Sequence, residues 1–272
     1  MTQCESTATA PRSMVESELA RYLVDQLVLQ DTASNPRRLI VGISGIPASG
    51  KTTFAQILTR HIDDILVTLP DINHPQAVLV GLDGWHFTRA QLDLFPDPKT
   101  AHDRRGSHWT FDGASYVSFV RSLRDTTTSV ISAPSFDHAL KDPTPNAISI
   151  YPHHRIVIIE GLYTFLAIEP WREGGLLLDE RWFIQVDPVE AKRRLVKRHV
   201  LTGVAKDLKE AEWRADENDG PSKYLPSPFS SECYLIFLMT CIFHIPDGLF
   251  VIENMLEPTR IIKSRDDPSL EL

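Results

Sequence analysis

The sequence predicts an α/β fold, with a parallel sheet that carries helices on both faces. Three observations support this: short, almost uninterrupted apolar runs, amphipathic segments between them, and a glycine-rich turn after the first apolar run. Uninterrupted apolar runs are typical of strands buried on both sides, and strands that alternate with helices favour a parallel sheet. The 272 residues suit one such domain.

The elements follow in a regular order. An amphipathic helix is expected from Ser13, with one apolar face formed by Val15, Leu19, Tyr22, Leu23 and Leu27. Strands are predicted over 38–44, 77–83, 155–161, 181–187 and, shorter, 259–264. Helices are predicted over 51–62, 114–125 and 188–203, the last strongly basic. We therefore divide the chain into a tail and helix over 1–35 and a main domain over 36–272.

Composition excludes some classes of partner. The net charge of −8 argues against nucleic acid, whose backbone rewards clustered Lys and Arg. The three cysteines form no metal or disulfide pattern, which favours reduced thiols in the cytoplasm. The longest apolar run, 233–245, is shorter than the roughly 20 residues of a transmembrane helix. A homo-oligomer would leave no recognisable pattern, so the oligomeric state stays open.

The glycine-rich turn carries the strongest motif. Residues 43–53 read ISGIPASGKTT. The match to G-x-x-x-x-G-K-[ST] consists of Gly45, Ile46, Pro47, Ala48, Ser49, Gly50, Lys51 and Thr52, and Thr53 follows. Such a turn directs backbone N–H groups at phosphates, the lysine reaches the terminal phosphates, and the threonine hydroxyl can bind Mg²⁺. The sequence thus predicts a P-loop NTPase fold that uses ATP and Mg²⁺.

Two acidic residues end the next predicted strands. Asp83 ends the strand over 77–83, and Glu160 lies at the end of the strand over 155–161. Because the carboxyl ends of parallel strands face the ligand crevice, both carboxylates are expected beside the phosphates. One could hold Mg²⁺, and the other could accept a proton from an attacking hydroxyl. The alternative is that each caps a turn. The N-K-x-D sequence of GTPases does not occur.

Four further motifs appear in a fixed order: DGWH, RRG…TFD, PSFDHALKDP and IIEGLY. With the glycine-rich turn they resemble the phosphoribulokinase/uridine kinase family of P-loop kinases, and most of all its uridine kinase-like and pantothenate kinase-like members from fungi and bacteria. The matching segments cover about 38–219 and 249–266. The resemblance implies an ATP-dependent kinase that phosphorylates a hydroxyl of a small molecule.

The resemblance also implies roles for particular residues. Asp83 would deprotonate the acceptor, and Glu160 would organise the metal together with Thr52. The acceptor pocket would include His86, Arg105, Asp112, Asp137 and His138, with Trp85 a weaker candidate. Ordinary loop hydrogen bonds, or packing for Trp85 and His86, are the alternative. His153-His154 lacks a third ligand, so a loop is favoured over a metal site.

The basic segment 188–203 resembles the family's lid. Arg193, Arg194 and Arg198 match its R-R-x-x-x-R pattern, and Arg194 and Arg198 are expected at the nucleotide. Guanidinium groups there would neutralise the transferring phosphoryl group. His199 stands where the family often has aspartate, which leaves the lid geometry open. A solvated basic face is the alternative.

Residues 220–248 depart from the family pattern, because Pro-Ser clusters and an apolar run separate two segments that are continuous in its relatives. Three interpretations remain open: an insertion that packs on the domain or a partner, a membrane-surface contact, or translated non-coding sequence. If the segment is present, an inactive binding protein is one alternative function. A regulatory or assembly ATPase without a small acceptor is another. The acceptor also stays open among nucleosides, pantothenate-like alcohols and sugars.

Overall fold

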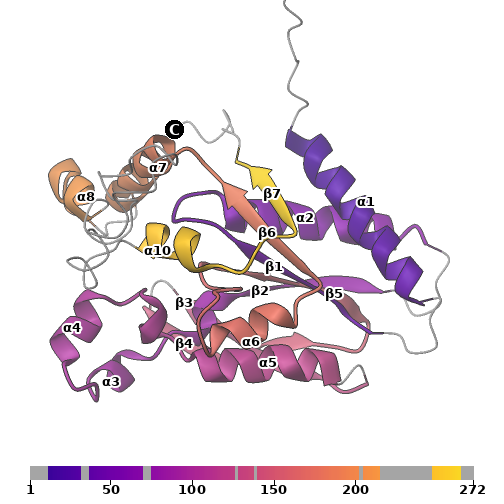
Figure 1. Ribbon diagram of the computed structural model, residues 1–272, viewed down its shortest axis with the longest axis horizontal. Coiled ribbons are helices and arrows are strands. Elements are labelled where there is room, and N and C mark those ends of the chain that lie inside the picture. Colours follow the sequence, from indigo (N-terminus) through magenta and orange to yellow (C-terminus); the bar gives the residue numbers. More distant parts are fainter. Residues whose placement is uncertain are drawn as a thin grey trace, which may run out of the picture.

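A computed structural model describes residues 12–31, 37–69, 75–125, 128–137, 140–201, 205–214 and 247–264 (Figure 1). At its centre lies a five-stranded sheet with the order β2-β5-β1-β6-β7. The strands are β1 (Leu39–Ser44), β2 (Gln76–Gly81), β5 (His154–Glu160), β6 (Glu180–Gln185) and β7 (Arg260–Lys263). All four neighbouring pairs are parallel, as the apolar runs predict.

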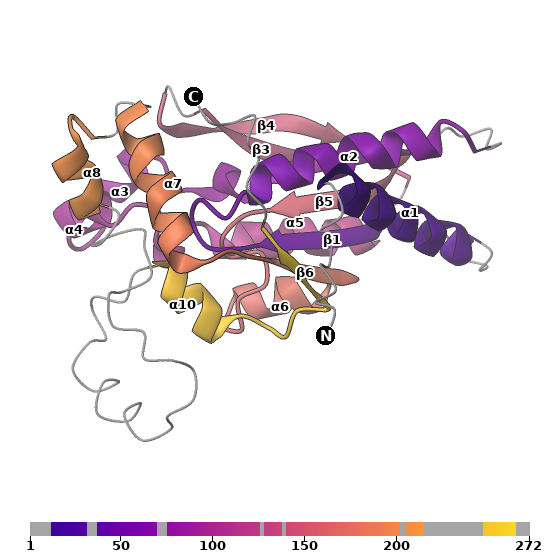
Figure 2. The same cartoon turned by 90° about the horizontal axis from the view of Figure 1, so that it is seen from above.

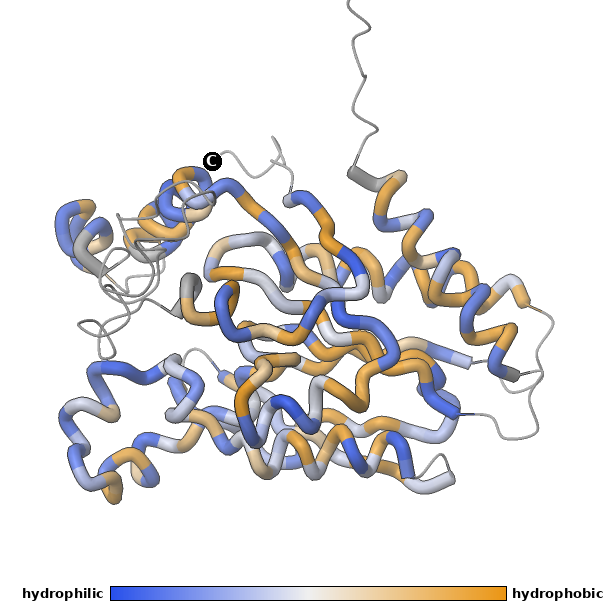
Figure 3. The backbone as a smooth tube through the Cα atoms, viewed as in Figure 1, coloured by the Kyte–Doolittle hydropathy of each residue, from blue (hydrophilic) through white to orange (hydrophobic). Residues whose placement is uncertain are grey.

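Helices cover both faces of this sheet, which confirms the predicted fold class. On one face lie α1 (Arg12–Asp31) and α2 (Lys51–Leu66), and on the other lie α5 (Gly113–Asp125) and α6 (Trp171–Leu176) (Figure 1). Alternate residues of β1 serve two separate cores: Ile40 belongs to the α5 side, and Leu39 and Val41 to the α1–α2 side. Figure 3 shows these apolar strands enclosed by helices of mixed polarity.

The segment after β2 differs from the sequence prediction. The second strand ends at Gly81, and Leu82–Trp85 forms a 3₁₀ turn, η1, so Asp83 lies in a turn and not in the strand. The polar segment 134–143, which carries the motif PSFDHALKDP and for which the sequence predicts no strand, lies largely in an antiparallel hairpin of β3 (Ile131–Asp137) and β4 (Asp142–Ile150). Its prolines and exposed polar residues conceal the strand pattern, since they are typical of edge strands and loops.

Short helices surround the carboxyl ends of the strands. They are α3 (Arg89–Leu92), α4 (Pro98–Asp103), the 3₁₀ turn η2 (His108–Thr110), α7 (Pro188–Leu201), α8 (Leu208–Arg214) and α10 (Asp247–Asn254). In Figure 2, α3, α4, α7 and α8 gather at one end of the molecule. Residues 215–246, with nearly all of the anomalous segment 220–248, lie outside the described residues. None of the described helices is long and apolar enough to cross a membrane.

Candidate active site

The turn between β1 and α2 has the geometry of an anion cradle. Ala48 and Gly50 both adopt positive φ angles, 59° and 85°, which turn successive N–H groups toward one side. Gly50 begins α2 without any side-chain hydrogen bond to the first turn of the helix. The free N–H groups and the positive end of the helix dipole therefore suit a phosphate group.

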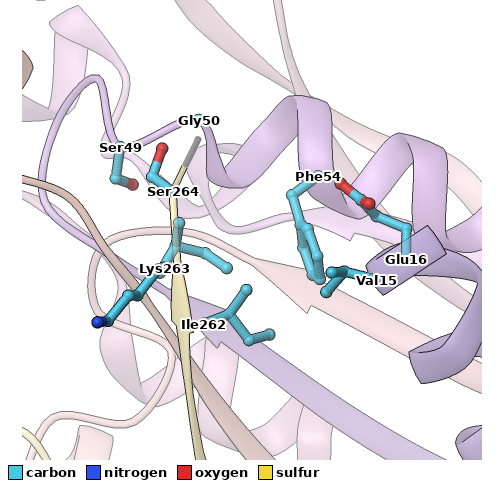
Figure 4. A pocket seen from close by; sticks show the side chains of 9 residues that line it. Val15, Glu16, Ser49, Gly50, Phe54, Ile262, Lys263 and Ser264 are labelled. Carbon is cyan, nitrogen blue, oxygen red and sulfur yellow. The ribbon is translucent and has the colours of Figure 1, made fainter. Parts of the chain in front are cut away.

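Close packing explains the first glycine of the motif. A Cβ atom at Gly45 would lie 2.6 Å from the Oγ atom of Ser49 and 2.9 Å from the carbonyl oxygen of Ile184. The Ser49 hydroxyl is buried and has no hydrogen-bond partner among the described residues. It borders a cavity of about 20 Å³, room for about one water molecule. In Figure 4, Ser49 and Ser264 lie at one end of this cavity, and Val15 and Phe54 at the other. A cradle with an unpartnered hydroxyl fits a polar ligand such as ATP.

The sheet register places Glu160 beside the turn. Glu160 is paired with Ile43 of β1 on one side and with Gly81 of β2 on the other. Its two carboxylate oxygens each lie 3.2 Å from the Oγ1 atom of Thr52, which donates to them. The sheet therefore brings together two predicted site residues that are far apart in the sequence. A hydroxyl and a carboxylate are hard oxygen ligands, so this pair also fits Mg²⁺.

Burial shifts the charges of this cluster. It lowers the pKa of Lys51 by penalising the charged amine, while the carboxylates of Glu160 and Asp83 oppose that shift and Arg198 adds to it. Burial likewise raises the pKa of Glu160, against the effect of Lys51. These interactions place Lys51, Glu160, Asp83 and Arg198 within one electrostatic cluster, and a bound cation and phosphates would complement its charges.

Asp83 has an exposed side chain at this end of the sheet, with 52% of its surface accessible. Its backbone carbonyl oxygen lies 2.8 Å from the Nδ1 atom of His86, and a carboxylate oxygen lies 4.0 Å from the same atom. The His86 ring is packed between Phe111 and Phe136, at centroid distances of 3.8 and 4.9 Å. The aromatic contacts fix the imidazole beside an accessible carboxylate.

Arg105 is held by the protein itself. Its guanidinium donates to the carbonyl oxygens of Lys141 and Phe87 and, at 3.0 Å, to the carboxylate of Asp142. Asp142 also accepts from the backbone N–H and the Nε atom of Arg89, at 2.9 and 3.1 Å. We call Arg89, Arg105 and Asp142 the hairpin clamp, because they fasten the tip of the β3–β4 hairpin to the segment after η1.

Sequence reasoning missed this role of Asp142 and Arg89. Asp142 belongs to the quoted motif PSFDHALKDP, but the motif does not show which cations it meets. Arg89 and Asp142 are 53 residues apart, so no local spacing links them.

The other predicted acceptor residues take different positions. Asp112 caps α5, since its carboxylate accepts from the backbone N–H and the hydroxyl of Ser115 at 2.9 and 2.7 Å. Asp137 ends β3, is exposed, and accepts from the backbone N–H of Leu140 at 3.2 Å. Trp85 is buried against Tyr116 and Phe119. His138 lies outside the described residues.

The three arginines of the basic helix α7 differ in their surroundings. Arg193 and Arg194 both pair with Glu190 on the same helix, at 2.8 and 2.6 Å. Arg194 also donates to the hydroxyl of Ser264, which follows β7. Arg198 is exposed, and its charge acts on Lys51. The side chain of His199 lies outside the described part of the chain.

His153 and His154 lie at the opposite end of the sheet, at the start of β5. Their rings are 4.5 Å apart and contact Tyr151. Among the described residues, no group of three or more His, Cys, Asp or Glu side chains could hold a metal ion. His153 lies in a turn, as the loop interpretation of His153-His154 predicts. His154 differs from it, because it is the first residue of the strand.

Comparison with known proteins identifies relatives of this chain. ATP-dependent kinase-like protein notR′ of Aspergillus versicolor is 48% identical over 141 residues, which are 51% of this chain and 82% of that protein. A Schizosaccharomyces pombe protein named as a candidate uridine kinase is 34% identical over 183 residues, 67% of this chain and 75% of that protein. No protein-family model matches the chain.

A solved structure shows the same fold. That of YFH7 from Saccharomyces cerevisiae, described as a candidate P-loop kinase with a circular permutation, aligns with a TM-score of 0.68 at 22% identity, and the alignment covers 91% of this chain and 99% of YFH7. The structural similarity shows only the fold. The two sequence relatives also show the family, because this chain spans at least three quarters of the length of each of them. The chain belongs to the uridine kinase-like family of ATP-dependent P-loop kinases.

Proposed function

We propose that this protein transfers the γ-phosphoryl group of MgATP to a hydroxyl of a small nucleoside-, pantothenate- or sugar-like metabolite. The observation that carries the proposal is the cluster at the carboxyl ends of β1, β2 and β5. A cradle of N–H groups, a lysine, a hydroxyl–carboxylate pair and an accessible second carboxylate lie there together. A phosphate site alone would not require the second carboxylate.

The phosphate end of the reaction would be handled by α2 and its preceding turn. Backbone N–H groups of the turn and of the first turn of α2 would bind the β-phosphate, and Lys51 would neutralise charge on the transferring group. Thr52 and Glu160 would hold Mg²⁺, which when bound screens the phosphate charges. Binding of these charges would favour the ionised forms of Lys51 and Glu160 that burial opposes.

The acceptor end would depend on Asp83. Its carboxylate is accessible and interacts electrostatically with Lys51 and Glu160, so it can accept the proton of an acceptor hydroxyl near the phosphates. His86 would support Asp83 by holding its backbone carbonyl oxygen through Nδ1. Arg105 would act mainly by fixing the hairpin, because its two terminal nitrogens bind Lys141, Phe87 and Asp142.

The basic helix α7 would complete the site. Arg198 is the lid arginine whose charge acts on Lys51, so it would neutralise charge on the transferring phosphoryl group. Arg194 reaches Ser264 beyond β7 and would contact the nucleotide from that side. Closure of α7 over the phosphates would exclude water and favour transfer over hydrolysis.

The substitution Asp83→Asn tests the proposal. It removes the base but keeps the size of the side chain, so acceptor-dependent ADP release should fall at least about a hundredfold while MgATP affinity changes little. Asp64→Asn, at an exposed position of α2, is the matched control and should behave as wild type.

Full transfer activity in the Asp83→Asn variant would exclude Asp83 as the base. The regulatory ATPase alternative predicts steady ATP hydrolysis by the wild-type protein without any acceptor. ADP release that stays negligible until an acceptor is added supports the kinase instead.

A further inference from the structure

A cleft of about 430 Å³ lies beside the candidate active site. Three elements that contact one another form it: the η1 turn, the exposed side of α5 and the β3–β4 hairpin. Figure 1 shows α5 beside the hairpin. Its walls include Gly84, His86, Asp112, Ser118, Ser132 and Asn146. A space of this size can hold a metabolite of the size of a nucleoside.

The cleft adjoins the proposed base, Asp83. Gly84 directly follows Asp83 in the chain, and His86 lines the cleft while its Nδ1 atom lies 4.0 Å from the Asp83 carboxylate. A molecule that lies in the cleft can therefore extend a hydroxyl toward Asp83. From Asp112 the cleft follows α5 to Ser122, more than two helical turns further along.

The hydroxyl groups on α5 are oriented by their own helix. Ser115 donates to the carboxylate of Asp112 at 2.7 Å, Ser118 to the carbonyl oxygen of Ala114 at 3.0 Å, and Ser122 to that of Phe119 at 2.7 Å. Each hydroxyl has one proton, so these serines offer only lone pairs to a ligand. This wall of the cleft suits ligands that carry O–H or N–H donors.

Formal charge points in the same direction. Among the described residues that line the cleft, Asp112 is the one acidic group, and neither lysine nor arginine lines it. The nearby guanidinium of Arg105 is bound to Asp142 and to two carbonyl oxygens. A carboxylate or phosphate in the cleft would therefore lie near the charge of Asp112, with no lysine or arginine in the lining to balance it. His86 also lines the cleft, but its Nδ1 atom faces the backbone carbonyl oxygen and the carboxylate of Asp83.

We propose that this cleft holds the body of the acceptor, and that the acceptor is an uncharged molecule rich in hydroxyl or amide donors. The inference rests on the proposed kinase function and specifies its substrate class. Among the candidate acceptors it favours nucleosides, neutral sugars and polyols, and it disfavours molecules that end in a carboxylate or phosphate.

The test compares pairs of related acceptors in which one member carries a carboxylate and the other does not. ADP release is measured with panthenol and pantothenate, with sorbitol and gluconate, and with uridine and 5-carboxyuridine. For each pair that is used, kcat/KM of the wild-type protein should be at least about tenfold higher for the uncharged member, since a like charge placed in the cleft is repelled.

The variant Ser118→Arg places a cation in the middle of the cleft wall. It should reduce this preference roughly tenfold by favouring the anionic member, with no change in KM for ATP. Val28→Arg is the matched control: position 28 is exposed on α1, which covers the opposite face of the sheet from α5, so the preference of this variant should stay within about twofold of wild type.

The outcomes separate the two levels of the proposal. Equal use of anionic and uncharged acceptors, or a preference that Ser118→Arg and Val28→Arg alter equally, overturns the assignment of the cleft and leaves the kinase function standing. Absence of acceptor-dependent ADP release with every compound, together with steady hydrolysis of ATP, overturns the kinase function itself.

Discussion

The hairpin clamp makes a strong prediction about Asp142. Its carboxylate binds Arg105 at 3.0 Å and Arg89 at 3.1 Å, and so ties the hairpin tip to the segment that follows the proposed base. Asp142→Asn keeps the shape and one oxygen acceptor but removes the charge that both arginines share. We expect a loosened hairpin and, because the hairpin forms one wall of the cleft, a higher KM for the acceptor.

The exposure of these three side chains determines how much free energy the substitution should cost. The Arg105 and Asp142 side chains are 15% and 28% exposed, so their charge-assisted hydrogen bond contributes about 1.5–3 kcal/mol. The Arg89 side chain is 56% exposed, which limits its pair to about 1 kcal/mol or less. Since asparagine retains an acceptor, the expected loss in the free energy of docking the hairpin is about 1–3 kcal/mol.

Hydrogen exchange of the amides in β3 and β4 would measure this loss directly, and KM values for ATP and acceptor would show its effect on function. Asp103→Asn is the matched control, because it breaks an exposed pair with Lys99 whose partners are 60% and 86% exposed, and it should cost less than about 0.5 kcal/mol. Two results would refute this role of Asp142: β3 and β4 amides that exchange at the wild-type rate in the Asp142→Asn variant, or a KM for ATP that rises as much as the KM for the acceptor.

Two further predictions concern the cradle and the far end of the sheet. Gly45→Ala brings a Cβ atom to within 2.9 Å of the backbone oxygen of Ile184, so the turn must shift and MgATP affinity should fall at least about tenfold in calorimetry. Gly81→Ala meets its nearest atom at 3.9 Å and should bind MgATP much as wild type, and equal affinities in both variants would contradict the packing argument. The pKa of His154 is lowered to about 4, chiefly by burial and then by the charges of His153 and Arg38. The unfolded chain therefore takes up a proton below about pH 6.5 that the folded chain refuses, and stability is lost as the pH falls from 6.5 toward 4. With a discount for its partial exposure, this loss is about 1–2 kcal/mol, and His154→Asn should abolish it in urea titrations at pH 7 and pH 4.5. An unchanged pH dependence in that variant would exclude His154 as the source.

The main sheet could be predicted from sequence because its strands are apolar on both faces and its cradle has a fixed motif. The predicted strand over 38–44 and helix over 51–62 are confirmed as β1 and the larger part of α2. The prediction that Asp83 is the last residue of a strand was wrong, because the strand ends at Gly81 and the backbone then turns. Apolar residues continue to Leu82, so hydrophobicity gives no signal of that turn.

The hairpin and the short helices could not be predicted, for two physical reasons. The hairpin depends on contacts between residues far apart in the sequence, such as Arg89 and Asp142, and its strands carry Pro134, Pro143 and Pro145. In α6, Gly174 and Gly175 disfavour a helix locally. Close packing overrides that preference, because a Cβ atom at Gly175 would lie 2.9 Å from the Cα atom of Phe165.

The separation of the hairpin from the main sheet has an evolutionary consequence. Glu160 is fixed by hydrogen-bonded pairing with two neighbouring strands, whereas one wall of the cleft comes from a two-stranded sheet that pairs with neither. Mutations that reshape the hairpin can change which compound is accommodated without disturbing the nucleotide. An ancestral chain with this architecture could thus evolve to bind new metabolites through single substitutions in the hairpin, while its nucleotide site stayed constant.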